Sequence, residues 1–310
     1  MPVDVPRNTE KLVKPSWLKV KAPGSPEYLE TKSIVKSLRL HTVCEEAHCP
    51  NIGECWSHST ATFMIMGDLC TRKCHFCAVK KGDSDTLQPL DPLEPERVGR
   101  AVRDLKLKHA VITSVDRDDA TDNGAGHFAK TVAAIRKHAP ECKIELLIPD
   151  LQGSWKDLET IVKSGVDVLN HNIETIPRLY KKVRPGAGYI RSLTLLSTAK
   201  QINPSLITKS GIMVGLGESK EEVFQVMDDM RHHNIDIMTI GQYLRPSNRQ
   251  LPVRAFITPE EFKEFETVGL EKGFAFVESG ALVRSSYHAW KHTEGAQKKL
   301  DAALAGHGVV

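Results

Sequence analysis

Six of the seven cysteines lie in two triplets close together in the chain, and their spacing indicates a chemical rather than a purely structural role. The first triplet, in CEEAHCPNIGEC, comprises Cys44, Cys49 and Cys55; the second, in CTRKCHFC, comprises Cys70, Cys74 and Cys77. An odd number of cysteines concentrated in this way favours metal ligation or catalysis over a disulfide framework. Cys142 stands alone in the apolar run CKIELLI, and we interpret it as a small buried hydrophobic residue.

The spacing in CTRKCHFC places three thiolates on one short loop, close enough to converge on a single metal centre. Structural zinc normally requires four ligands in two separated pairs, and ferredoxin-type clusters also use four cysteines. Three thiolates on a four-iron cluster would leave one iron open to bind another molecule. A structural metal site is the alternative for this loop.

CTRKCHFC resembles the cluster-binding loop of the radical S-adenosylmethionine family. The resemblance includes the aromatic Phe76 before the last cysteine and an apolar strand, Phe63 to Met66, before the loop. It implies that Cys70, Cys74 and Cys77 hold a catalytic 4Fe-4S cluster whose open iron chelates S-adenosylmethionine. It also implies that an electron from the reduced cluster cleaves the sulfonium, giving methionine and a 5'-deoxyadenosyl radical.

The first triplet narrows the resemblance to the lipoyl synthase family within these radical enzymes. The order and spacing of Cys44, Cys49 and Cys55 ahead of the radical loop are similar to that family. The similarity covers roughly residues 12 to 290. The matching stretches are KPSWLK, TSVDRDD, NHNIET, KVRPGAGY, GLGE, GQYLRPS and RSSYHA.

The resemblance implies a second, auxiliary 4Fe-4S cluster on the first triplet, with a serine of RSSY on its fourth iron. By motif position this ligand is Ser286, with Ser285 as the alternative. A hydroxyl is a harder and poorer ligand for cluster iron than a thiolate, so it can be displaced. RSSY alone would be interpreted as a surface turn, and only the upstream triplet favours the ligand.

The resemblance implies a sulfurtransferase reaction in lipoate biosynthesis. An octanoyl chain, amide-linked to a lysine of a lipoyl carrier domain, receives sulfur at carbons 6 and 8. Such carbons are unactivated, which is why radical chemistry is required, and two S-adenosylmethionine molecules are consumed. The auxiliary cluster supplies the sulfur and must then be rebuilt.

Polar residues that follow the strands are candidates to bind S-adenosylmethionine. The candidates for its methionine or ribose part are Ser114, Asp116, Asn170, Glu174 and Arg184, and those for its adenine side are Gly215, Glu218, Gln242 and Tyr243. Arg184 suits a carboxylate. Arg284 is a candidate to contact the auxiliary cluster or the carrier. His48 and His75 are interpreted as loop residues rather than ligands, and each of the candidates has a structural alternative.

Composition and charge argue against a protein that mainly binds nucleic acid or a membrane. The chain has 310 residues, 40% of them hydrophobic and 26% charged, with a net charge of +3. Nothing in this balance indicates nucleic acid or a membrane as the main partner. The N-terminus MPVDVPRNTEKLVKPSW has neither a hydrophobic signal core nor the character of a transit peptide, so we expect a cytoplasmic protein.

The resemblance also implies protein partners. These are octanoylated lipoyl carrier domains, namely the glycine cleavage H protein and the E2 component of 2-oxoacid dehydrogenases. They also include a reductant such as ferredoxin or flavodoxin, and an iron-sulfur carrier that rebuilds the auxiliary cluster. A binding or electron-transfer protein, or another radical enzyme that inserts sulfur, is the competing interpretation.

The elements that must position these residues alternate regularly between strands and helices of ten to fifteen residues. This rhythm predicts parallel βαβ units, and we interpret residues 61–245 as a partial (β/α)6 TIM-type barrel. A doubly wound sheet has the same rhythm, but no G-x-G-x-x-G follows the first strand. Because the candidate residues recur after successive strands, we expect them at the C-terminal face of the barrel.

Extensions flank the predicted barrel on both sides. Residues 1–60 form an N-terminal extension that carries the first triplet, and residues 246–310 form a C-terminal extension with the RSSY motif. Capping boxes predict helix starts at Ser219 and at Thr258, and FAFVESG predicts a seventh strand. We expect the last fifteen residues, AQKKLDAALAGHGVV, to be a frayed end.

Overall fold

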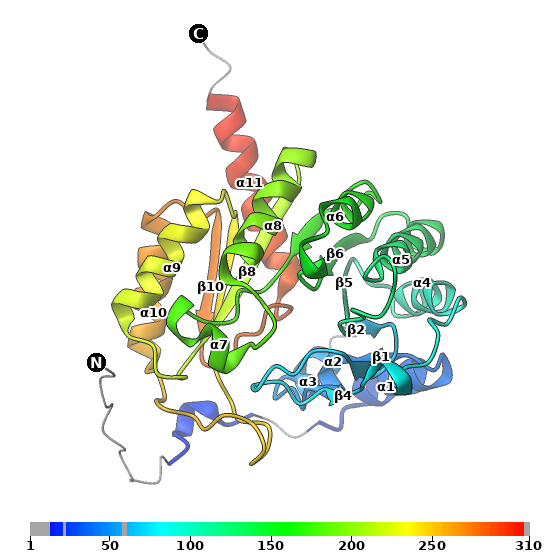
Figure 1. Cartoon of the computed structure of the whole chain (residues 1–310), viewed down its shortest axis with the longest axis horizontal. Helices are drawn as coiled ribbons and strands as arrows, with labels where there is room; N and C mark the ends of the chain where they lie inside the picture. Colours follow the sequence, from blue (N-terminus) through cyan, green and yellow to red (C-terminus); the bar gives the residue numbers. More distant parts are fainter. Residues whose placement is uncertain (1–12, 21–22, 58–60, 307–310) are drawn as a thin grey trace.

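A curved sheet of eight strands forms the centre of the computed structural model, which describes residues 13–20, 23–57 and 61–306 (Figure 1). Its strand order is β1-β2-β5-β6-β7-β8-β9-β10; β1 runs antiparallel to β2, and the other neighbours are parallel. The bounds are β1 His41–Thr42, β2 Thr62–Ile65, β5 His109–Ser114, β6 Lys143–Leu147, β7 Val168–Asn170, β8 Ile207–Val214, β9 Ile237–Gln242 and β10 Phe276–Gly280.

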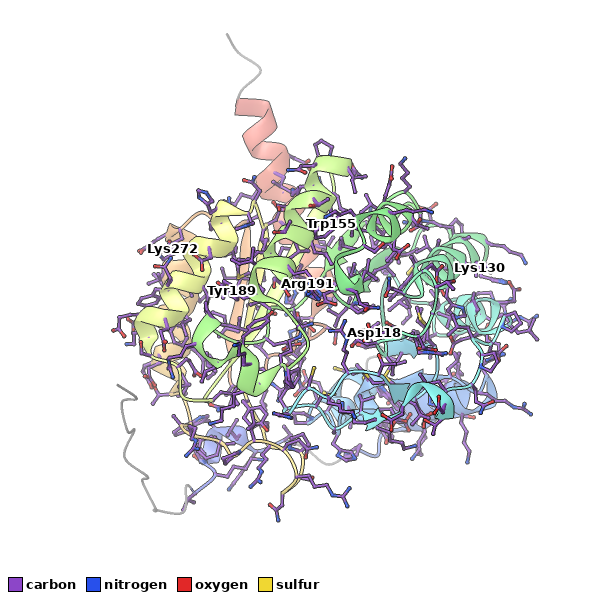
Figure 2. The ribbon with its side chains drawn as sticks, viewed as in Figure 1. Asp118, Lys130, Trp155, Tyr189, Arg191 and Lys272 are labelled. Carbon is purple, nitrogen blue, oxygen red and sulfur yellow. The ribbon has the colours of Figure 1, made fainter. Side chains whose placement is uncertain are left out.

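Helices follow the parallel strands and cover the outer side of the sheet (Figure 1). They are α4 Glu94–Asp104, α5 Ala125–His138, α6 Trp155–Val162, α8 Tyr189–Ile202, α9 Lys220–His232 and α10 Pro259–Glu271. The short helix α7, Tyr180–Val183, precedes α8 and lies beside the second cysteine triplet. Short 3-10 turns lie at Ser16–Leu18, Ser84–Thr86, Leu151–Gly153 and Pro177–Leu179. Lys130 of α5 and Lys272 after α10 lie on the outer side of this layer (Figure 2). The helices therefore turn their apolar faces toward the sheet.

The predicted barrel is confirmed as a partial one. Strands β2, β5, β6, β7, β8 and β9 with their helices are the six expected repeats, and β10 is the predicted seventh strand. Within the described part of the chain, no ladder joins β10 back to β1 or β2, so the barrel is open. Both capping boxes are present: Ser219 and Thr258 each bond reciprocally with the glutamate three residues on.

The C-terminal segment differs from its prediction. The sequence predicts a frayed end for the last fifteen residues, but residues 296–306 belong to helix α11, Ala289–Gly306; residues 307–310 lie outside the described residues. Ala296 packs with Val168, Ile207 and Ile237, near the starts of three strands. The helix is therefore stabilised by covering the end of the barrel opposite to the candidate site.

The N-terminal extension packs against the edge of the barrel at β2. It contains α1 Pro26–Ser37, α2 Val43–Glu46 and α3 Ile52–Ser57, while residues 1–12, 21–22 and 58–60 lie outside the described residues. The Thr31 hydroxyl of α1 donates to the carbonyl of Trp56, which is fully buried, and so joins α1 to α3. Since β1 pairs with β2, the segment carrying the first triplet is fixed beside the first barrel strand.

A small two-stranded sheet frames the second triplet. Strands β3, Leu69–Cys70, and β4, Lys80–Lys81, pair in parallel and close the loop that contains CTRKCHFC. Gly82 adds a backbone bond to the carbonyl of Cys70 at 3.0 Å. Among the described residues there is no helix both long and apolar enough to cross a bilayer.

Candidate cluster-binding active site

A cavity of about 850 Å³ opens at the C-terminal ends of the barrel strands, and both cysteine triplets line it. The six cysteines that line this cavity are Cys44, Cys49, Cys55, Cys70, Cys74 and Cys77, and all are free of disulfides. Ser285 and Ser286 line the same cavity, although RSSY lies more than two hundred residues after the first triplet in the chain. The fold thus gathers the three cysteine- and serine-bearing motifs around one space.

The second triplet is held from both sides by backbone bonds. Thr71 N donates to the carbonyl of Asp116 after β5, and His75 N donates to the carbonyl of Val183 at the end of α7. The His75 ring nitrogen Nδ1 lies 2.7 Å from the carbonyl of Lys182, so that nitrogen is bound to backbone. These contacts fix the loop over the strand ends.

The first triplet is built from two short helices joined by a turn. Cys44 lies in α2, Cys55 lies in α3, and Cys49 N donates to the Cys44 carbonyl at 3.0 Å. Asn51, which is buried, donates from Nδ2 to the carbonyl of Leu282 at 2.7 Å. This bond ties the triplet to the segment that leads into RSSY.

Two further contacts bring RSSY to the first triplet. Tyr287 Oη donates to Glu54 Oε1 at 3.0 Å, and His288 Nε2 lies 3.7 Å from the same oxygen. At Gly241, at the end of β9, a Cβ atom would lie 2.2 Å from the carbonyl oxygen of Val283. Only glycine allows this close approach of the C-terminal segment to the barrel.

The donor set fits iron-sulfur clusters better than single metal ions. Burial raises the pKa of Cys44 and Cys74 to about 11, and that of Cys55 and Cys70 to about 12. A bound metal must therefore displace protons from buried thiols that are neutral at pH 7. No three His, Cys, Asp or Glu side chains of the described ranges converge as a single-ion site. Cluster ligands bind different irons, so they do not need to meet at one point.

Asp116 and Arg184 line the cavity beside the second triplet. The thiol of Cys70 donates to Asp116 Oδ2 at 3.6 Å, and Arg184 Nη1 donates to the carbonyl of Asn172 at 2.6 Å. Burial raises the pKa of Asp116, although the positive charges of Arg72 and Arg184 oppose the shift. A carboxylate and a guanidinium at this wall can receive the ammonium and carboxylate of an amino acid.

Glu174 also lines the cavity and has an unusual backbone, with φ of 72°. Its N–H donates to the Gly211 carbonyl and its carbonyl accepts from Met213 N, both at 2.9 Å. These bonds to β8 compensate for the strained conformation. Burial raises the pKa of the Glu174 carboxyl, although the charges of Arg184 and Arg284 lower it. The side chain thus lies in the field of two arginines at the cavity wall.

The sequence-predicted residues for S-adenosylmethionine divide into two groups. Those that line the cavity are Ser114, Asp116, Glu174, Arg184, Gln242 and Tyr243, and those outside its lining are Asn170, Gly215 and Glu218. Asn170 donates to Glu145 in the barrel interior at 2.9 Å. Glu218 instead accepts from Gly215 N and from Leu216 N, so it shapes the loop after β8.

Gln242 and Tyr243 combine cavity lining with structural bonds. Gln242 Nε2 donates to the carbonyls of Val214 and Ala255, and its Oε1 accepts from Ile257 N. Tyr243 Oη donates to the carbonyl of Leu251 at 2.7 Å. Both side chains therefore fasten the segment after β9 to the barrel.

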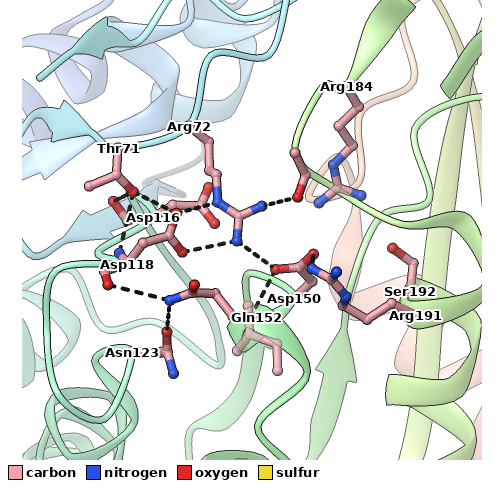
Figure 3. Close-up of polar contacts among 12 residues, drawn as sticks. Thr71, Arg72, Asp116, Asp118, Asn123, Asp150, Gln152, Arg184, Arg191 and Ser192 are labelled. Atoms are coloured by element: carbon pink, nitrogen blue, oxygen red, sulfur yellow. Dashed lines mark hydrogen bonds and ion pairs between the residues drawn. The ribbon is translucent and has the colours of Figure 1, made fainter. Parts of the chain in front are cut away.

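Several residues at the site were not singled out from the sequence. Arg72 and Asp118 connect the second triplet to neighbouring strand ends, as Figure 3 shows, and Asn51 holds the first triplet. His171 lines the cavity and is bound by Ile148 O and Ser192 Oγ. Arg72 and Asn51 lie inside the two cysteine motifs, so position within a motif was the only available signal.

Comparison with known proteins adds to this geometry. The Radical SAM superfamily model matches residues 64–230, and a model of the N-terminal domain of lipoyl synthase matches residues 4–49. Lipoyl synthase of Roseiflexus sp. is 54% identical over 284 residues, covering 92% of this chain and 93% of the relative. Lipoyl synthase of Rubrobacter xylanophilus is 54% identical over 295 residues, covering 95% and 90%.

Solved structures show the same fold at low sequence identity. Methylornithine synthase aligns with a TM-score of 0.51 and 16% identity, covering 73% of this chain and 72% of its own. HydG, a maturase of the FeFe-hydrogenase, aligns with a TM-score of 0.55 and 14% identity, covering 68% and 49%. These likenesses show the fold alone.

Proposed function

The chain belongs to the lipoyl synthase family of the radical S-adenosylmethionine superfamily, and from this membership we propose that it is the sulfurtransferase that inserts sulfur at carbons 6 and 8 of an octanoyl chain. The octanoyl chain is carried on a lysine of a lipoyl carrier protein. The enzyme's cofactors are S-adenosylmethionine and two 4Fe-4S clusters. Two S-adenosylmethionine molecules serve the two carbons.

The observation that carries this proposal is the common cavity of both triplets and RSSY. An electron-transfer protein would need two fully ligated centres, whereas CTRKCHFC supplies three thiolates. The cavity of about 850 Å³ has the size of a site for a ligand of several hundred daltons. It therefore suits an extended acyl chain beside S-adenosylmethionine.

In this proposal the second triplet holds the radical cluster and the first triplet holds the auxiliary cluster. When bound, the clusters supply the electron that cleaves S-adenosylmethionine and the sulfur that enters the product. Ser286, with Ser285 as the alternative, completes the auxiliary site as a weak oxygen ligand. Arg284 places a positive charge near Cys49, where it favours the thiolate.

The cavity-lining residues bind and orient S-adenosylmethionine in the proposed reaction. Arg184 receives the methionine carboxylate, and Asp116 receives the ammonium, for which its carboxylate form is needed. Ser114 and Glu174 face the methionine or ribose part. Gln242 and Tyr243 hold the segment after β9, and this segment faces the adenine.

Asn170, Gly215 and Glu218 support this binding from behind the cavity wall. Gly215 has a φ of 97°, and a Cβ there would meet the Gln242 amide at 2.2 Å. Glu218 holds the amides of the same loop. We propose that these residues set the position of Gln242, while Asn170 sets the end of β7.

The proposed partners follow from the reaction. The substrates are octanoylated lipoyl carrier domains of the glycine cleavage H protein and of the E2 component of 2-oxoacid dehydrogenases. Ferredoxin or flavodoxin supplies electrons, and an iron-sulfur carrier rebuilds the auxiliary cluster. We place the reaction in the cytoplasm.

The test is to incubate the anaerobically reconstituted and reduced protein with S-adenosylmethionine and an octanoyl-lysyl peptide. We expect 5'-deoxyadenosine, a peptide carrying two sulfur atoms, and about eight irons per chain. Formation of 5'-deoxyadenosine without any thiolated peptide would overturn the proposal. An iron content of about four would remove the auxiliary cluster from it.

Two cysteine variants serve as matched controls for this test. Cys74→Ala should abolish 5'-deoxyadenosine and product together, because the radical cluster loses a ligand. Cys49→Ala should retain 5'-deoxyadenosine and lose the thiolated peptide. Equal loss of both products in the two variants would contradict the division of roles between the triplets.

A further inference from the structure

Arg72 lies inside CTRKCHFC, and its guanidinium is bound by three other loops of the barrel (Figure 3). Nε and Nη2 donate to the two carboxylate oxygens of Asp118, which follows β5. Nη2 also donates to Asp150 Oδ1 after β6 at 3.1 Å, and Nη1 donates to the carbonyl of Gly186 at 2.7 Å. One side chain thus joins the cluster loop to the loops after two strands and to the turn RPGAG.

The two carboxylates that hold Arg72 are themselves fixed. Arg191 of α8 donates to Asp150 Oδ2 at 3.1 Å, and Gln152 N donates to Asp150 Oδ1 at the same distance. Thr71 Oγ1 donates to Asp118 Oδ2 at 3.1 Å. The acceptors are therefore also held by bonds other than those to Arg72.

The network is partly withdrawn from water. The Arg72 side chain is 12% exposed and that of Asp150 is 1% exposed. Burial by itself would raise the pKa of Asp150, but the charge of Arg72 and of other cationic neighbours holds it below its usual value. The pair with Asp150 is therefore ionised. The bidentate contact is the one with Asp118, whose side chain is 26% exposed, and a contact of this fork-to-carboxylate kind restricts geometry.

The contact between Gly186 and Arg72 lies close in the chain to Arg184, a residue of the cavity wall. Its φ of 87° turns the carbonyl toward Arg72, and a Cβ there would lie 3.6 Å from Nη1. Gly186 lies two residues after Arg184, which lines the cavity with Cys74. Displacing Arg72 would therefore move the cluster loop and the arginine turn relative to each other.

We propose that Arg72 is a positioning residue that holds the radical-cluster loop in register with the S-adenosylmethionine wall of the cavity. Its planar fork, rather than its charge alone, performs this role, because three acceptors in three directions are bound at once. The inference rests on the proposed function for its link to catalysis. Its structural part is tested separately.

The first test measures amide hydrogen exchange in the wild-type chain, Arg72→Lys and Arg72→Gln. We expect both variants to exchange at least about tenfold faster across residues 70–77 and 184–188, because the loops lose their common anchor. Helix α10 should be unchanged. Exchange in Arg72→Lys equal to wild type would overturn the role of the fork.

Arg136→Lys is the matched control. Like Arg72, Arg136 binds three acceptors, but here they are two carbonyls and one carboxylate near the starts of the strands, namely Cys142 O, Gly165 O and Asp167 Oδ2. Asp118→Asn is a second test variant, since it keeps the shape of the acceptor and removes its charge. We expect Arg136→Lys to leave residues 70–77 unchanged and Asp118→Asn to accelerate their exchange.

The second test follows the reconstituted holoenzyme by electron paramagnetic resonance. The reduced radical cluster of wild type should change its spectrum when S-adenosylmethionine is added, whereas Arg72→Lys should retain its iron and show a weaker or different change. Thiolated peptide per 5'-deoxyadenosine should fall about 10- to 100-fold. A wild-type spectral change and ratio in Arg72→Lys would overturn the proposal.

Failure of this inference is distinguishable from failure of the proposed function. If wild type produces no thiolated peptide, the sulfur-insertion proposal fails, but exchange and the spectral change still test Arg72. If wild type is active and Arg72→Lys matches it in all three measurements, only the positioning role is wrong.

Discussion

Asn51 Nδ2 donates to the carbonyl oxygen of Leu282 at 2.7 Å, joining two residues that are 231 positions apart in the chain. Asn51 lies between Cys49 and Cys55, and Leu282 lies just before RSSY. The bond connects the first triplet to its proposed serine ligand without passing through the barrel. We therefore predict that assembly of the proposed auxiliary site depends on contact between the two extensions.

Replacing Asn51 by alanine should weaken that contact. A partly buried carbonyl left without its donor costs at most about 1–3 kcal/mol, and this bond would no longer hold the C-terminal segment against the triplet. We expect iron content after anaerobic reconstitution to fall from about eight toward about four, with 5'-deoxyadenosine formation retained. Asn203→Ala, at a turn before β8, is the control. Full iron content in Asn51→Ala would contradict the prediction.

Ser286→Ala and Ser285→Ala distinguish the two candidate ligands. Both serines line the cavity, and the Ser286 carbonyl accepts from Ala289 N at the start of α11. If Ser286 is the ligand, its loss should reduce the thiolated peptide at least about tenfold while 5'-deoxyadenosine persists, and Ser285→Ala should have less effect. The measurement is the ratio of the two products. The reverse order of effects would assign the ligand to Ser285.

The barrel was predictable because its signals are local. Buried β-branched runs such as AVITSV predict strands, and the capping boxes at Ser219 and Thr258 predict the starts of α9 and α10, each independently of the other elements. Helix α11 was not predictable in the same way. Its stability comes from packing of Ala296 against strands β7, β8 and β9, which the local sequence does not reveal.

The cysteine sites were predictable as motifs, but their connections were not. The spacing of Cys70, Cys74 and Cys77 predicts a metal centre. Apart from its place in the motif, nothing in the sequence distinguishes Arg72 from other arginines, because its acceptors are brought to it only by the fold. The direction of the Asn170 side chain was not predictable either, since it faces the barrel interior rather than the cavity. A residue that follows a strand can turn to either side, and the sequence alone does not decide which.

Lys209→Met should destabilise the barrel strongly. Lys209 and Glu145 are fully buried, and Lys209 Nζ lies 2.9 Å from Glu145 Oε1. The side-chain amide of Asn170 also donates to Glu145. Removing the ammonium leaves a buried carboxylate without its charged partner, at a cost of about 3–5 kcal/mol. Urea unfolding is the measurement. The double variant Glu145→Gln with Lys209→Met should recover part of the loss, and no recovery would show that packing rather than charge is responsible.

His292→Phe should make the stability of the chain less sensitive to acid. His292 of α11 is fully buried beside Phe276, and its Nε2 lies 3.6 Å from Glu278 Oε2, longer than a hydrogen bond. Burial, together with the charge of Lys209, lowers the pKa of His292 from 6.5 to about 4. The folded state therefore holds a neutral ring.

The stability that His292 contributes is fully present above pH 6.5 and is lost as the pH falls toward 4, because the unfolded chain binds the proton first. The loss is about 1.4 kcal/mol per pH unit in this window. Phenylalanine keeps the ring packing and cannot titrate. Thermal unfolding midpoints at pH 7 and pH 5 should therefore differ less in His292→Phe than in wild type. His171, whose pKa burial also lowers to about 4, should leave a residual slope in the variant. An unchanged difference between the two pH values would show that His292 is already protonated in the folded protein, with Glu278 as its counter-ion.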